Sequence, residues 1–248
     1  MLHGALASAV ALVLFALFFN PLMALAGDVL AYGQAQHIVT QYPSRLRASF
    51  SSQGYRYVPY QELPSCIKEG IVSVEDKRFY QNRGIDPIAL VRVLFMSFRN
   101  DHVDHGGSTL TQQLAREIIQ EPRRKPGVFA NTLGVLRVLR YALVVDHDFT
   151  KPEILEIYLN GTYFGRGAYG IAQAAQAYFH ANLENLTFGQ CVYLAGLPQA
   201  PSYFGAHPDG AAAQARYRHV LATMVRNDYL ASTTAAVLGK ADLFSAAP

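Results

Sequence analysis

The longest uncharged hydrophobic run in the chain lies at its start. From Ala5 to Ala26 there is no charged residue. As a helix this segment would extend roughly 33 Å at about 1.5 Å per residue, enough to cross a hydrocarbon core of about 30 Å. The run ends in Ala-Leu-Ala before Gly27, which is also typical of a signal-peptidase site. Residues 1–27 are therefore predicted to be a transmembrane anchor or a cleaved signal peptide, and both predict export.

Helical spacing dominates the rest of the chain. Residues 28–57 are a mixed polar and aromatic connector without a clear period. After Pro64, a residue that a first helical turn tolerates, the apolar residues Ile67, Ile71 and Val74 are spaced by four and three. The same kind of pattern predicts further helices at 86–100, with Asp86 as N-cap, from Ser108 or Thr109 onward, and at 132–145, 150–160 with Thr150 as N-cap, 169–179, 186–197 and 211–230.

Alternating strand patterns and internal repeats are absent from the sequence, which predicts an all-α chain. We place one compact domain at 58–235, followed by a tail at 236–248. The segment 91–98 is apolar nearly all round, which indicates burial or contact with a membrane surface.

Composition narrows the function classes. The net charge is only +3 and the basic residues are scattered, so a nucleic-acid partner is not expected. Cys66 and Cys191 show neither zinc-site spacing nor a disulfide framework, and both are interpreted as small core residues. Charged residues make up 16% of the chain, below the usual quarter, so acids beside apolar residues need a reason.

Such acids are Glu75 and Asp76, adjacent carboxylates at the end of the apolar run "CIKEGIVSV". A carboxyl group in apolar surroundings has its pKa raised by desolvation, and a base with a raised pKa is suited to take a proton near neutral pH. Because few charged residues surround this helix end, we expect the carboxyl group there to lie in apolar surroundings that raise its pKa. The alternative is a pair of solvated surface acids.

Five short stretches follow one another in a characteristic order: "EDKRFYQNRG", "GGSTLTQQLAR", "KPEILEIYLN", "YFGRGAYGIAQAAQAYF" and "LAGLPQAPS". Each is weak alone, but together they resemble glycosyltransferase family 51. This is the peptidoglycan glycosyltransferase domain of penicillin-binding proteins and of monofunctional transglycosylases. The resemblance covers about Val58 to Tyr203 and extends more loosely to Leu230.

The resemblance implies a lysozyme-like helical head lobe with a smaller membrane-facing jaw lobe, preceded by a transmembrane helix. It implies polymerisation of lipid II into glycan chains with inversion, at the outer side of the cytoplasmic membrane. The implied partners are lipid II, the growing glycan chain, the membrane and other cell-wall synthesis proteins.

The resemblance also implies residue roles. Glu75 is expected to be the general base that takes the proton from the acceptor 4-hydroxyl, and Asp76 to organise the site through hydrogen bonds. Asn160 is expected to fix the fold. The positions expected to hold substrate are Asp76, Asn82, Ser108, Thr109, Gln112, Gln113, Arg116, Lys151, Tyr163 and Arg166.

One family motif is broken. The third motif, Arg-Lys-x-x-Glu, falls on Gly134, Val135 and Val138 when counted back from Lys151, so its acid and both basic residues are missing. In the family that Glu is thought to assist at the donor pyrophosphate, directly or through a divalent metal such as Mg²⁺ or Mn²⁺, and we assign no metal here. Asp146 coincides with an acid that the family often has, so it is not expected to substitute.

Two hypotheses therefore stay open: a glycosyltransferase with altered donor handling, and a weakened or inactive homologue that binds lipid-linked glycan or serves as a scaffold in cell-wall synthesis. Glycan hydrolysis fits poorly, because a second acid to activate water is not evident. The Ser65–Lys68 match to the Ser-x-x-Lys motif of transpeptidases lacks the downstream boxes, so Ser65 is expected to belong to a helix start.

Overall fold

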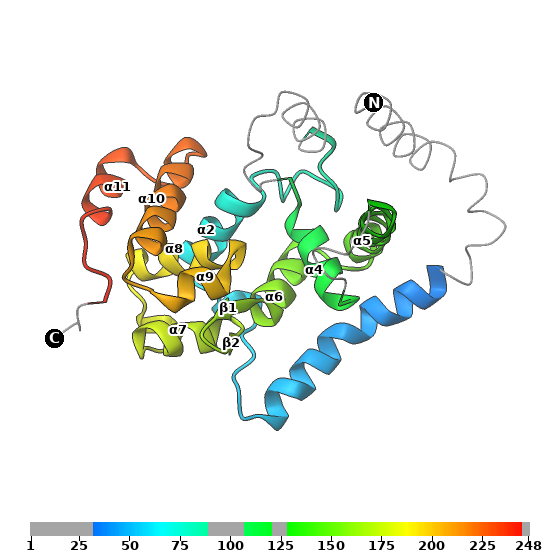
Figure 1. Cartoon of the computed structure of the whole chain (residues 1–248). Coiled ribbons are helices and arrows are strands. Elements are labelled where there is room, and N and C mark those ends of the chain that lie inside the picture. Colours follow the sequence, from blue (N-terminus) through cyan, green and yellow to red (C-terminus); the bar gives the residue numbers. More distant parts are fainter. Residues whose placement is uncertain (1–31, 89–106, 121–127, 245–248) are drawn as a thin grey trace.

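The computed structural model describes residues 32–88, 107–120 and 128–244 (Figure 1). These residues are mostly helical, which confirms the predicted fold class at that level. Among them, none of the helices combines the length and the apolar character needed to cross a membrane. The apolar segments predicted at 5–26 and 91–98 lie outside the described residues.

The described part of the chain begins with a helix at 32–52 that the sequence pattern did not predict. It is the long helix drawn in blue in Figure 1. The elements that follow it are η1 (Tyr60–Glu62), α2 (Ser65–Glu75), α4 (Leu110–Ile118), α5 (Val128–Asp148) and α6 (Lys151–Gly161). Ser65 thus opens a helix, as expected.

The second half contains one feature that the sequence did not predict, a two-stranded antiparallel hairpin in which Tyr163 lies opposite Tyr169. Its strands are too short to show an alternating pattern. The elements of this half are β1 (Tyr163–Gly165), β2 (Ala168–Tyr169), α7 (Ile171–Phe179), η2 (Leu183–Asn185), α8 (Phe188–Gly196), η3 (Leu197–Gln199), α9 (Pro201–Ala206), α10 (Ala211–Arg226) and α11 (Ser232–Leu238).

Threonine capping boxes begin three of the helices. Thr109 caps α4, Thr150 caps α6 and Thr187 caps α8, and each side chain accepts a hydrogen bond from the backbone N–H three residues on. The side chain of the Gln or Glu at that third position accepts a hydrogen bond from the backbone N–H of the capping threonine. Each such cap stabilises its helix by about 1 kcal/mol. The predicted caps at Thr109 and Thr150 are therefore confirmed.

Helix α2 is the central element of the core. It packs against α8 and α10, and its apolar residues Ile67 and Ile71 are fully buried. Helix α4 packs against α5 and α6. Asn160 is fully buried and bonds the backbone N–H and carbonyl of Val58, so its structural role is confirmed.

The two cysteines form a disulfide, which corrects the interpretation of both as separate core residues. Cys66 in the first turn of α2 is bonded to Cys191 of α8, with Cα atoms 5.7 Å apart, a usual disulfide separation. The residues are 125 positions apart in sequence, so only the packing of α2 on α8 brings them together. The bond ties the helix that carries Glu75 to the core.

We expect the disulfide to stabilise the domain by about 2–4 kcal/mol, because it restricts the unfolded chain across a long loop. Replacing both cysteines (Cys66→Ser with Cys191→Ser) should lower the free energy of unfolding by that amount. Urea unfolding of the oxidised protein, the reduced protein and the double variant measures this. Identical unfolding midpoints for oxidised and reduced protein would contradict the prediction.

Candidate active site

The Glu75 carboxylate lies at the last residue of α2 and is held by two side chains from other helices. Gln113 of α4 donates from Nε2 to Oε2 at 3.0 Å. Arg216 of α10 donates from Nη2 to Oε1 at 2.9 Å. The Glu75 side chain is 12% exposed and that of Arg216 is 10% exposed, so this is a nearly buried ion pair.

Arg216 is the site residue that sequence reasoning missed. The expectation of an apolar, uncharged setting for Glu75 is wrong, because the guanidinium contacts the carboxylate directly. Burial lowers the pKa of Arg216, and the Glu75 carboxylate opposes that shift. The Arg216 Nε also donates to the carbonyl of Gly196 at 2.8 Å, which fixes the orientation of the guanidinium. Because the partners are 141 positions apart in the sequence, no spacing rule could have linked them.

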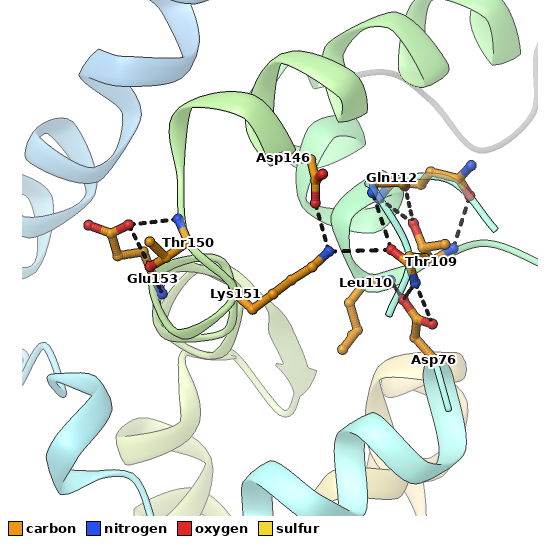
Figure 2. Close-up of polar contacts among 10 residues, drawn as sticks. Asp76, Thr109, Leu110, Gln112, Asp146, Thr150, Lys151 and Glu153 are labelled. Carbon is orange, nitrogen blue, oxygen red and sulfur yellow. Dashed lines mark hydrogen bonds and ion pairs between the residues drawn. The ribbon is translucent and has the colours of Figure 1, made fainter. Parts of the chain in front are cut away.

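Asp76 organises the junction between α2 and α4, as expected from its predicted role. Its carboxylate is buried and accepts hydrogen bonds from the Asn82 amide, at 3.0 Å to both oxygens, and from the backbone N–H of Leu110 at 3.1 Å. Burial raises the pKa of Asp76, and these hydrogen bonds oppose the shift. Figure 2 shows the carboxylate directed at the first turn of α4.

Two further predicted substrate residues are engaged in capping α4. The Gln112 side chain accepts a hydrogen bond from the Thr109 N–H (Figure 2). The Thr109 hydroxyl donates to the carbonyl of Gly84 at 2.6 Å. Both residues are buried. Their side chains therefore position α4 against the loop after α2.

Lys151 also bonds within the protein. Its Nζ donates to Asp146 at 2.6 Å (Figure 2). It also donates to the side-chain amide oxygen of Asn82 at 3.3 Å and lies over the Phe79 ring. Asp146 is thus paired with Lys151. Arg166 is exposed in the turn between β1 and β2, with its guanidinium 5.5 Å from the centre of the Tyr178 ring.

A cavity of about 1200 Å³ lies beside Glu75. Five of the predicted site residues line it: Glu75, Ser108, Gln113, Arg116 and Tyr163. Asp76, Asn82, Thr109, Gln112, Lys151 and Arg166 are not among its lining residues. The structure therefore separates the predicted set into residues that line the cavity, residues whose side chains are bonded within the protein around it, and the exposed Arg166.

The position of the missing motif acid belongs to the hydrophobic core. Val138 on α5 is 3% exposed and packs in the main apolar cluster. A divalent metal needs several oxygen or nitrogen ligands, and the described residues contain no group of three His, Cys, Asp or Glu side chains suited to bind one. The residues present at this position do not fit a divalent cation.

The helical fold, the cavity-facing carboxylate and the ordered motifs define a transglycosylase domain. A family model described as Transglycosylase matches residues 44–225, most of the chain, and the chain belongs to this family.

Curated relatives agree with this assignment. Penicillin-binding protein 1A of Rickettsia bellii is 33% identical over 198 residues, covering 77% of this chain and 24% of that protein. Penicillin-binding protein 1A of Escherichia coli is 35% identical over 173 residues, covering 70% and 20%. The Aquifex aeolicus protein of the same name is 34% identical, covering 75% and 25%. The chain thus spans about a quarter or less of the length of these relatives.

We expect the Glu75–Arg216 pair to show strong energetic coupling. Arg216→Met should lower the free energy of unfolding by about 3 kcal/mol, because it leaves a nearly buried carboxylate without its cation. In the Glu75→Gln background the same change should be much milder. Urea unfolding of the two single variants and the double variant measures the coupling. Additive effects would show that the ion pair has no net interaction energy.

Proposed function

We propose that this domain polymerises lipid II into glycan chains, with Glu75 as general base and inversion at the anomeric carbon. The observation that carries the proposal is the placement of the Glu75 carboxylate at the wall of a large cavity, oriented by Gln113 and Arg216. Membership of the Transglycosylase family supports the reaction class.

In the proposed reaction the acceptor 4-hydroxyl oxygen attacks the anomeric carbon of the donor. The bond from that carbon to the pyrophosphate oxygen breaks, its electron pair leaves with the lipid pyrophosphate, and Glu75 takes the hydroxyl proton. The two described hydrogen bonds occupy one site on each Glu75 oxygen. A carboxylate has about four acceptor sites, so Glu75 can receive a proton without first losing either partner.

Among the predicted residues, substrate contact is assigned to Ser108, Gln113, Arg116 and Tyr163, which share the cavity with Glu75. Arg116 contributes positive charge for the pyrophosphate. Arg166, exposed on the hairpin, is proposed to meet lipid-linked substrate outside this cavity. The residues assigned to positioning are Asp76, Asn82, Thr109, Gln112 and Lys151, whose side chains are bonded to neighbours.

Because the substrate is lipid-linked, we place the domain at the outer face of the cytoplasmic membrane. The growing glycan chain and other cell-wall synthesis proteins are its proposed partners. The second candidate function is a binding or scaffold protein with weak or no turnover. The observation that favours it is Val138, which is buried in the core where the family has its second acid.

We expect Glu75→Gln to lower the rate of glycan chain formation by about 10²–10⁴-fold, the usual contribution of a general base. Its affinity for lipid II should change little, because the amide keeps the shape of the side chain. The assay follows labelled lipid II with the detergent-solubilised protein. Glu62→Gln, at an exposed glutamate paired with Arg56, is the matched control. Equal rates for Glu75→Gln and wild type would refute the proposed base, and an inactive wild type would favour the scaffold function.

Val138→Glu should not restore a family-like site. Its side chain would enter the apolar core, and a buried carboxyl without a partner lowers stability by several kcal/mol. We expect a lower unfolding midpoint and no gain in glycan product. Val138→Leu, which keeps an apolar side chain, controls for the change in volume. A Val138→Glu protein of unchanged stability with increased turnover would show instead that position 138 acts on the donor.

A further inference from the structure

One face of α4 borders the cavity and carries an acid outside the recognised motifs. The lining residues of this helix are Gln113, Arg116 and Glu117, at the i, i+3 and i+4 positions of a single helical face. Glu117 therefore lies about one helical turn, roughly 5–6 Å along the axis, beyond the glutamine that holds Glu75. The cavity thus contains a second carboxyl group, on an element that packs against α5.

Glu117 has a specific environment. The Tyr42 hydroxyl, from the helix at 32–52, donates to its Oε1 at 2.6 Å. Gly161 of α6 makes room for it, because a Cβ at that position would clash with the Glu117 carboxyl group. Burial raises the pKa of Glu117 to about 7, and the hydrogen bond from Tyr42 opposes that shift. A substantial fraction of Glu117 therefore carries a proton at neutral pH.

The cavity wall also offers hydrogen-bond donors. The Thr162 hydroxyl and the Gln173 amide nitrogen are buried and have no hydrogen-bond partner in the described part of the chain, and both residues line the cavity. Arg116 adds a cationic donor. Together with a protonated Glu117, these groups suit a ligand that has only acceptors, such as a phosphate oxygen.

We propose that Glu117 acts in its carboxylic acid form and donates a hydrogen bond to a pyrophosphate oxygen of the lipid-linked donor. This inference rests on the proposed function. With Oε1 engaged by Tyr42, Oε2 carries the proton. As the anomeric carbon–oxygen bond breaks, its electron pair moves onto the pyrophosphate, and the hydrogen bond stabilises the developing charge. The proton stays on Glu117 when the lipid pyrophosphate leaves, while Glu75 holds the proton taken from the acceptor.

The role assigned to Glu117 predicts a pH dependence that a purely structural role would not. As pH rises through about 7, Glu117 loses its proton and can no longer donate a hydrogen bond. The resulting carboxylate anion then faces the pyrophosphate, and turnover should fall. The titratable groups that line the cavity together with Glu117 are Glu75 on α2, Arg116 on α4, Tyr42 on the helix at 32–52, Tyr55, Tyr158 on α6, and Tyr163 and Tyr169 on the hairpin. Within the described part of the chain, Tyr42 donates the hydrogen bond that Glu117 accepts.

The test compares the pH profile of lipid II polymerisation for wild type, Glu117→Gln and Tyr42→Phe. The amide N–H of Glu117→Gln is a hydrogen-bond donor at every pH. The polymerisation rate of this variant should therefore reach a lower plateau without the alkaline decline. Tyr42→Phe removes the bond that lowers the pKa of Glu117, so the decline should move to higher pH. Glu117→Ala should be slower by about 10- to 100-fold at pH 6, the effect of losing a hydrogen bond to a charged group.

The outcomes separate this inference from the proposed function. If Glu75→Gln abolishes turnover while Glu117→Gln and wild type share one alkaline decline, the function stands and the role of Glu117 is overturned. A rate that rises with pH through 7 in wild type alone would also overturn it, since Glu117 would then act as an anionic acceptor for a sugar hydroxyl.

If wild type forms no product, binding of a polyprenyl pyrophosphate in detergent provides the second readout. Wild type should bind it more weakly above pH 7, and Glu117→Gln should lack that change, while titration of the ligand itself affects both proteins equally. The same pH dependence in both proteins would overturn the proposed contact. The control Glu62→Gln should follow wild type in both assays.

Discussion

The buried carboxylate of Asp76 is the constraint on which the rest of the site depends. It follows the last residue of α2 and accepts the backbone N–H of Leu110, the first residue of α4. A carboxylate is favoured at the positive end of a helix dipole. Because Glu75 precedes Asp76 and Gln113 lies one turn into α4, this single contact fixes the relative positions of Glu75 and the glutamine that donates to it.

The two carboxyl groups of the cavity meet opposite environments. Glu75 faces the Arg216 cation, whereas Glu117 faces the neutral hydroxyl of Tyr42. Differences of this kind are how two acids in one enzyme site take different protonation states and different roles. In the proposed reaction one carboxyl group accepts a proton from the acceptor and the other offers a hydrogen bond to the leaving group.

The broken third motif also acquires a structural explanation. Val138 contributes to the packing of α5 in the core, where an acid would be unsupported. Helix α4 packs against α5 and presents Arg116 and Glu117 to the cavity. In the proposed reaction Arg116 and Glu117 serve the donor side from this neighbouring helix, and the proposed mechanism uses no acid at position 138.

The sequence by itself determined the features whose causes are local. The order of its motifs identified the family, and the caps at Thr109 and Thr150 were predictable because a cap acts on a residue three positions away. The tertiary structure alone decided the Cys66–Cys191 bond, the Arg216–Glu75 pair and the Tyr42–Glu117 contact. Their partners are 125, 141 and 75 residues apart. Helix packing brings such residues together, and no periodicity or spacing in a single sequence records which helix faces which.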